Sequence, residues 1–378
     1  MAAAGLIDTF TVPPHLEAAE PPEARGLARD GVRLLVSRAD RDTVAHSRFC
    51  DLPRWLSPGD LVLVNTSGTL KAALEARSAP GEQFALHLST QLPGNIWLIE
   101  MRRPGGGASL PYRHAQAGSH FDLDSGGRVT LLAPYPFAGR LDTPSRLWMA
   151  ALEIDQPVLS YLERFGSPIR YGYVNRPWPA SMYQTAFATD PGSAEMPSAA
   201  RPFTPELVTR LVAGGIQIAP LLLHTGVASL EDHEPPYEEF FRVPPETADR
   251  VNAARRAGRR VIAVGTTVVR AIETVTDSQG KTFPGEGWTS LVITADRPLR
   301  AVNGLITGFH EPRATHLAIV SQVIAAAGGD RPSLHLDRAY REARQREYLW
   351  HEFGDSHLIV SGQAPGIKGE GRRDKGER

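Results

Sequence analysis

The sequence predicts an α/β domain that carries an inserted antiparallel β-barrel domain, and three observations support this prediction. Helical and strand patterns alternate after residue 152, as in an α/β layer. Residues 72–151 instead hold short apolar runs separated by proline- and glycine-rich turns, with almost no helical periodicity. Residues 363–378 are polar and glycine-rich, which predicts a disordered tail. The α/β domain is therefore expected to comprise residues 1–71 and 152–362.

The α/β domain is expected to begin with strands at 27–40 and 60–65, where apolar runs are bounded by charged residues or glycine. Apolar residues at helical spacing predict four later helices, at 205–213, 245–257, 267–276 and 336–348. Continuous apolar runs between these helices predict four strands, at 216–223, 260–264, 290–294 and 356–360.

The inserted domain is expected to be a small barrel or sandwich of about five or six strands. Its clearest strand patterns lie at 84–88, 96–101, 129–133 and 146–152. Turns with Pro-Gly and Gly-Gly separate these segments.

Composition excludes several classes of protein. The 41 Lys and Arg against 42 Asp and Glu leave a net charge of −1, so the whole chain has no electrostatic bias toward nucleic acid. The single cysteine, Cys50, excludes an internal disulfide and a cysteine-rich zinc site. No apolar run approaches the length of about 20 residues that spans a bilayer, and the start lacks a basic leader region. We therefore expect a cytoplasmic protein.

A strand–turn–helix signal lies at 261–275. The apolar run at 261–264 precedes Gly265-Thr266-Thr267, which opens a helix. A helix N-terminus presents unpaired N–H groups that can bind an anion. The turn nevertheless lacks the glycine spacing of dinucleotide-binding and P-loop sites. A capped turn is favoured over a phosphate site on local grounds.

A second signal is the turn Gly308-Phe309-His310-Glu311-Pro312, which follows the apolar pair Leu305-Ile306. Active sites of α/β proteins often lie at such strand ends. Histidine can give or take a proton near neutral pH, so His310 is a candidate for proton transfer. The alternative is a structural, hydrogen-bonded histidine.

Histidine and carboxylate residues also occur in the segment 221–241. His224 ends a strand pattern, whereas His233 lies in a loop with five acidic residues: Glu231, Asp232, Glu234, Glu238 and Glu239. Pro235 and Pro236 break any helix, so a helical zinc motif is excluded and no metal site is expected. We interpret the loop as a solvated acidic segment that could cover a substrate.

Together these stretches resemble the S-adenosylmethionine:tRNA ribosyltransferase-isomerase family of queuosine biosynthesis. RRVIAVGTTVVRAIE is similar to the family's RVIAVGTTSVR block, MYQTAFATDPGS to its YQTVY…PG block, and NGLITGFHEPRAT to its ALxTNFHLPxST block. RDGVRLLV, PGDLVLVN and HEFGDSHLIV match further blocks in the family's order. The resemblance extends along nearly the whole chain to about residue 360.

The resemblance implies an α/β domain with an inserted barrel, and it implies a reaction. In the family, the ribosyl part of S-adenosylmethionine is transferred to the aminomethyl group of a 7-deazaguanine base at the tRNA wobble position. The transferred group is isomerised to an epoxycyclopentanediol, which gives epoxyqueuosine, while adenine and methionine leave. S-adenosylmethionine is then a co-substrate, no bound cofactor or metal is needed, and the partner is the tRNA anticodon loop. A monomer is expected.

The matching blocks also imply site residues. His310 and His224 are the catalytic candidates. The substrate-binding candidates are Tyr183, Gln184, Thr185, Gly226, Gly265, Thr266, Thr267, Arg270, Phe309 and Asp355.

The chain departs from the family pattern in several loops. Ala200-Arg201-Pro202 stand where the family has Gly-Leu-His, Gly68 replaces an arginine, and Gly308 replaces an asparagine. The segment that follows His224-Thr225-Gly226 is shortened. Because the changes lie in loops that would surround the substrates, two alternatives stay open. One is a paralogue that uses S-adenosylmethionine with a different, small-molecule acceptor, and the other is a non-catalytic binding protein.

Overall fold

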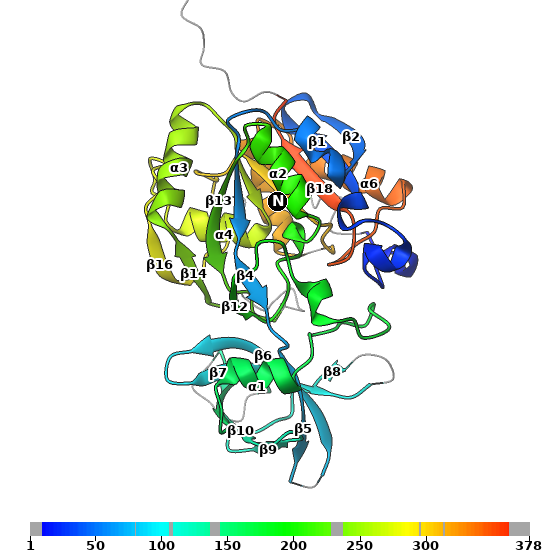
Figure 1. Ribbon diagram of the computed structural model, residues 1–378, viewed down its shortest axis with the longest axis vertical. Coiled ribbons are helices and arrows are strands. Elements are labelled where there is room, and N and C mark those ends of the chain that lie inside the picture. Colours follow the sequence, from blue (N-terminus) through cyan, green and yellow to red (C-terminus); the bar gives the residue numbers. More distant parts are fainter. Residues whose placement is uncertain are drawn as a thin grey trace, which may run out of the picture.

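The computed structural model describes residues 10–79, 81–105, 109–136, 144–227, 237–294, 296–312 and 314–362. The chain forms a larger α/β domain and a smaller β-barrel, which lies below it in Figure 1. The predicted fold class, an α/β domain with an inserted antiparallel barrel, is confirmed. The predicted disordered tail, 363–378, lies outside the described residues.

The α/β domain is built on a nine-stranded mixed sheet in the order β16-β14-β13-β3-β15-β17-β18-β1-β2. Strands β13, β3, β15 and β17 are parallel, and β18 pairs antiparallel with β17. The strands are β1 Arg33–Arg38, β2 Thr43–Arg48, β3 Leu61–Asn65, β13 Gln217–Leu223, β14 Glu239–Val243, β15 Val261–Val264, β16 Gly285–Thr289, β17 Gly304–Thr307 and β18 Ser356–Val360.

Helices cover both faces of this sheet, which explains why β3, β15 and β17 are buried at every position and carry polar residues only at Asn65 and Thr307, where β3 and β17 end. Because side chains alternate along a strand, Leu61 and Leu63 of β3 pack into the core with α3, α4, α5 and α6. Val62 and Val64 pack on the other face, with α2. The helices are α2 Pro205–Ala213, α3 Pro245–Arg256, α4 Thr266–Thr274, α5 His316–Ala326 and α6 Pro332–Gln345.

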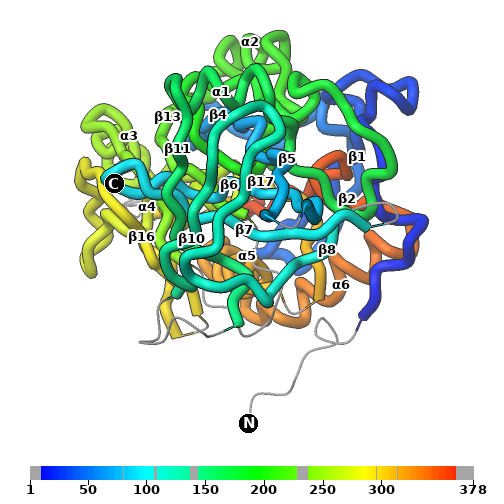
Figure 2. The backbone as a smooth tube through the Cα atoms, turned by 90° about the horizontal axis from the view of Figure 1, so that it is seen from below, coloured from blue at the N-terminus to red at the C-terminus, as the bar shows by residue number. Residues whose placement is uncertain are grey.

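The inserted domain is a closed barrel of six antiparallel strands in the order β11-β10-β9-β5-β6-β7, closed by the pairing of β11 with β7. A short strand, β8, adds to the edge of β7, and helix α1 (Val158–Phe165) packs on the barrel core through Tyr161 and Leu162. Figure 2 looks onto the barrel from below. Its strands are β5 Ala73–Ser78, β6 Gln83–Leu92, β7 Ile96–Arg103, β8 Leu110–Pro111, β9 His120–Leu123, β10 Arg128–Tyr135 and β11 Leu147–Glu153.

Two short parallel strands, β4 (Ser67–Thr69) and β12 (Asp190–Ser193), lie between the domains (Figure 1). The chain enters the barrel after β4 and returns after α1. Ala73 and Ser167 exchange two backbone hydrogen bonds of 2.9 and 3.0 Å, so the two crossings lie side by side. The predicted domain limits at 72 and 151 stay predictions.

Two strand predictions need correction. The strand expected at 27–40 is limited to β1, and residues 29–31 form a 3₁₀ turn before it. The strand expected at 290–294 is absent, because β16 ends at Thr289. The carbonyl of Leu291 accepts a hydrogen bond from Arg270 Nε at 3.0 Å, and Ile293 packs into the core. The apolar alternation there reflects packing on the domain rather than strand pairing.

A buried ion pair joins the starts of two central strands. Arg260, next to β15, and Asp60, next to β3, have side chains that are 3% and 0% exposed. Arg260 Nε lies 3.1 Å from both Asp60 oxygens, and Arg260 Nη1 donates to the Ser361 carbonyl at 3.0 Å. Asp60 also accepts from the Ser57 N–H at 2.7 Å. Every charged atom of the pair is thus compensated.

Asp60→Ala should lower the free energy of unfolding by about 3–5 kcal/mol, because Arg260 would be left as an uncompensated buried charge. Urea unfolding followed by circular dichroism measures this change. Asp122→Ala is the matched control, since Asp122 pairs with Arg128 on the barrel surface and should contribute less than about 1 kcal/mol. Equal losses in the two variants would contradict the importance assigned to the buried pair.

Candidate active site

A cavity of about 670 Å³ lies at the carboxyl ends of β15 and β17. This edge of a parallel sheet is where α/β proteins commonly bind ligands, and the volume suits a small molecule. Turns 265–267 and 307–311 form one wall, and the connection from the barrel forms another through residues of 169–173 and 194–199. Glu17, His351 and Glu352 also line the cavity.

The turn that opens α4 is part of the cavity wall. Gly265 has φ +98° and ψ 151°, a backbone conformation that side chains other than glycine rarely adopt. Its N–H donates to the Ile306 carbonyl at 2.8 Å, which ties the turn to β17. Gly265, Thr266 and Thr267 all line the cavity, and Gly265, at the N-cap position of α4, has no side chain that could cap the helix. The turn therefore presents backbone groups and hydroxyls to a ligand.

The cavity is rich in carboxylates. Glu17, Glu195, Glu311 and Glu352 line it, and none of the described lining residues is Lys or Arg. Burial raises the pKa of Glu352, and burial together with the charge of Glu311 raises the pKa of Glu17. Opposite charges attract strongly in such a partly enclosed space. The cavity therefore favours a cationic or neutral ligand over a phosphate.

His310 is held firmly in the wall. Its Nε2 lies 2.9 Å from Thr307 Oγ1, and its backbone N–H donates to the Tyr340 hydroxyl at 3.2 Å. The ring stacks on His316, with centroids 4.8 Å apart and planes 6° from parallel. Burial and neighbouring histidines lower the pKa of His310 well below its usual value. The imidazole is therefore neutral at neutral pH.

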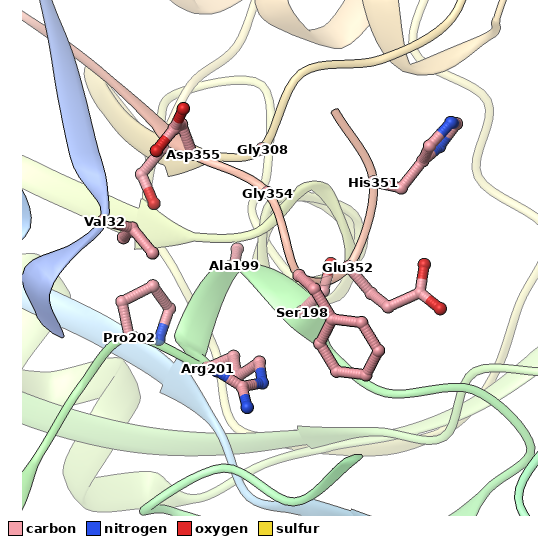
Figure 3. A pocket seen from close by; sticks show the side chains of 12 residues that line it. Val32, Ser198, Ala199, Arg201, Pro202, Gly308, His351, Glu352, Gly354 and Asp355 are labelled. Carbon is pink, nitrogen blue, oxygen red and sulfur yellow. The ribbon is translucent and has the colours of Figure 1, made fainter. Parts of the chain in front are cut away.

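Tyr173 joins two further polar residues of the cavity. Its ring stacks on His351 at 3.9 Å with planes 7° from parallel, and its hydroxyl donates to Glu352. Burial lowers the pKa of His351 to about 4, which keeps this ring neutral as well. His351 and Glu352 belong to the segment 351–355, and Figure 3 shows their side chains on one side of this segment and that of Asp355 on the other.

Six of the residues proposed from the sequence line the cavity: Tyr183, Gly265, Thr266, Thr267, Phe309 and His310. Tyr183 packs on Phe353 with ring centroids 5.2 Å apart, and burial raises the pKa of its hydroxyl to about 12. Phe309 stacks parallel to His357 at 5.7 Å and belongs to the sheet core. Both aromatic residues therefore connect the cavity wall to the packed interior.

Three proposed residues lie beside the connection to the barrel and not in the cavity lining. His224 Nδ1 is 2.7 Å from Ser67 Oγ, and burial lowers the pKa of its ring. The Gln184 side chain bonds to both backbone groups of Thr69, at 3.0 and 2.7 Å. Gln184 and Thr185 border a separate groove of about 380 Å³ along α1.

The other three proposed residues hold the walls in place. Gly226 allows a close approach, because a Cβ atom there would meet the Tyr237 hydroxyl at 2.2 Å. Arg270 forms an ion pair with Glu239, which is buried. The expectation that the acidic loop around His233 is solvated is therefore wrong at Glu239. The rest of that loop, 228–236, lies outside the described residues.

Asp355 is buried and pairs with Arg33 at 2.8 Å. Its carboxylate also accepts hydrogen bonds from the backbone N–H groups of Arg33 and Leu349, at 2.7 and 2.8 Å. These bonds anchor the segment that leads from the cavity into β18. Asp355 borders the narrow pocket of Figure 3 and not the large cavity.

Sequence reasoning did not propose several polar residues that the fold brings to the cavity, among them Glu17, Tyr173, His316, His351 and Glu352. His351 and Glu352 lie within the matched HEFGDSHLIV block, so that block held a signal. His316 follows His310 by six residues. Glu17 carries no motif, and it reaches the site because its backbone pairs with Trp350.

The chain is thus a two-domain α/β protein with an acid-lined cavity at the carboxyl ends of its parallel strands. The family profile of the queuosine biosynthesis proteins matches residues 8–359. The chain belongs to this family.

Named relatives match along their whole length. The S-adenosylmethionine:tRNA ribosyltransferase-isomerase of Moorella thermoacetica is 35% identical, over 93% of this chain and 98% of the relative. The enzymes of the same name from Symbiobacterium thermophilum and Thermus thermophilus are each 34% identical at the same coverage. The crystal structure of S-adenosylmethionine tRNA ribosyltransferase from Thermotoga maritima is 28% identical, with a TM-score of 0.49 over 94% of this chain and 100% of that one.

The described residues contain neither a metal-ligand cluster nor a membrane-spanning helix. No three His, Cys, Asp or Glu side chains in this part of the chain are grouped as metal ligands. No helix within it is both long and apolar enough to cross a membrane.

Unfolding should depend on pH through buried histidines, of which His357 is the clearest. Burial lowers its pKa to about 3, against an unfolded value of about 6.5. Below pH 6.5 the unfolded chain takes up a proton that the folded chain cannot, so stability is present above this pH and is lost as pH falls toward 3. His357→Gln should reduce the difference in unfolding free energy between pH 8 and pH 5 by about 2 kcal/mol.

Urea unfolding at the two pH values measures this effect, with His120→Gln on the barrel surface as the control. A His357→Gln variant that keeps the full pH dependence of the parent protein would contradict the assignment.

Proposed function

We propose that the protein transfers and isomerises the ribosyl moiety of S-adenosylmethionine onto 7-aminomethyl-7-deazaguanine in tRNA, giving epoxyqueuosine, adenine and methionine. S-adenosylmethionine is the co-substrate in this proposal, and the tRNA anticodon loop is the partner. Family membership and the names of relatives that match over 98% of their length support the reaction.

The observation that carries the proposal is the cavity lining of four carboxylates without Lys or Arg among its described residues. S-adenosylmethionine has a sulfonium, an ammonium and a carboxylate group and no phosphate, so its net charge is +1, and the aminomethyl base is a second cation. Both substrates therefore match the charge of the cavity. The volume of about 670 Å³ leaves room for a nucleoside and part of a second base.

The reaction needs a proton acceptor near the sulfonium, because the positive sulfur acidifies the hydrogens on the neighbouring C5′ carbon. We assign this role to His310, which is neutral, lines the cavity and is oriented by Thr307. Gly265, Thr266 and Thr267 are assigned to substrate binding, since their turn forms the same wall. His224, Gln184 and Arg270 are assigned to positioning, because each supports a wall from outside the cavity.

Adenine release tests the reaction. Purified protein with S-adenosylmethionine and tRNA carrying the aminomethyl base should release adenine and add the corresponding mass to the RNA, both followed by mass spectrometry. The same tRNA with unmodified guanine is the control and should give neither product. Adenine release that is independent of the tRNA would instead support a different acceptor.

His310→Ala should lower the rate of adenine release by about 10²-fold or more, because proton-transfer groups contribute that much to catalysis. Thr307→Val should give a smaller loss, since it removes only the hydroxyl that orients the ring. His120→Ala, on an exposed barrel strand, serves as the matched control. Near-normal turnover by a folded His310→Ala protein would remove His310 from the proposed mechanism.

A further inference from the structure

One corner of the cavity brings two carboxylates to a single histidine nitrogen. His351 Nε2 lies 3.8 Å from Glu17 Oε1 and 3.9 Å from Glu311 Oε1. These distances are too long for hydrogen bonds, yet short enough for one nitrogen atom placed between the groups to bond all three. The three groups come from segments far apart in the sequence, so the fold assembles this corner.

The histidine nitrogen in this corner makes no hydrogen bond within the described part of the chain. The His351 side chain is only 10% exposed, and its Nε2 atom is buried without a hydrogen bond among the described residues. Buried polar atoms are nearly always bonded in folded proteins, so an orphaned atom that lines a cavity indicates a place for a ligand. Because the ring is neutral, Nε2 can be an acceptor.

Within the described residues, no lysine or arginine offsets the charge of this corner. The pKa of Glu17 is raised, by burial and by the charge of Glu311. None of the described residues that line the cavity is Lys or Arg. A cation between these carboxylates would relieve their repulsion.

The backbone beside Glu17 and His351 is held by the fold, whereas the Glu311 side chain is 64% exposed. The Trp350 N–H donates to the Leu16 carbonyl at 2.8 Å, and the Ala18 N–H donates to the Trp350 carbonyl at 3.2 Å. Trp350 Nε1 also donates to the His310 carbonyl at 3.3 Å. His351 adopts φ +71°, a strained value for a residue other than glycine. This backbone fixes the ring against Tyr173 and aims it into the cavity.

We propose that Glu17, Glu311 and His351 form a binding site for a primary ammonium group of the substrate. An ammonium group carries three N–H donors, and the corner offers two carboxylates and one neutral imidazole nitrogen as three acceptors. This inference rests on the proposed function. Two substrate groups have this chemistry: the α-ammonium of S-adenosylmethionine and the aminomethyl group of the deazaguanine base.

The test compares the full-length protein with the double variant Glu17→Gln/Glu311→Gln, which keeps the shape of the corner and removes its charge. Glu206→Gln, an exposed residue in the first turn of α2, is the matched control. Isothermal titration calorimetry measures the affinity for S-adenosylmethionine and for its desamino analogue. Fluorescence anisotropy measures the affinity for an anticodon stem-loop RNA with the aminomethyl base, and for the same RNA with a nitrile in place of the aminomethyl group.

The double variant should bind one ammonium ligand about 10-fold more weakly or worse, while its affinity for the uncharged counterpart changes less than about twofold. The ligand whose binding weakens identifies which of the two ammonium groups the site binds. Unchanged affinities in both arms would overturn the proposal, and so would equal weakening of charged and uncharged ligands.

The binding assays separate this inference from the proposed function. If the parent protein releases adenine and the double variant binds all ligands normally, the ammonium site fails and the reaction stands. If the parent protein binds the ligands without releasing adenine, the reaction fails and the affinities still decide the inference. Binding of neither ligand by the parent protein would overturn both.

Discussion

The parallel pairing of β15 with β3 and β17 is the constraint on which the site depends. This register places Val264 opposite Ile306, so the turns that follow the two strands begin at the same level. Gly265 then bonds back to Ile306, and His310 follows three residues after the end of β17. Because the strands are buried on both faces, a slip in register would move apolar side chains to the wrong core. The pairing of the strands in the sheet thus sets the positions of the turns that line the cavity.

The second contribution comes from the segment between α6 and β18. Trp350 pairs with the N-terminal segment and bonds to the turn of His310, while Asp355 holds Arg33 and the backbone of Leu349. Between these anchors, His351 and Glu352 face the cavity. Chain segments from both ends of the sequence and from the middle therefore meet at one place. The site can form only when the α/β domain is complete.

The sequence predicted the parts of this arrangement that arise from local pattern. Apolar runs identified β15 and β18, and the change of texture identified the barrel, because these features depend on residues close in the chain. The apolar run at 290–294 was wrongly predicted to be a strand, because apolar residues that pack on the core outside a sheet look the same in the sequence as those of a buried strand. Glu17 could not be found, because its place in the cavity depends on a backbone pairing with residue 350. Motif matching found Asp355 and overlooked its neighbours that line the cavity.

The stem between the domains has a mechanical consequence. Thr69 ends β4 and Ala194 directly follows β12, and both residues line the cavity. The barrel is therefore connected to the α/β domain through residues that also line the cavity. A second contact joins the domains, because the Tyr237 hydroxyl lies 3.0 Å from Ser89 Oγ of the barrel. Any change in the angle between the barrel and the α/β domain would therefore move residues that line the cavity.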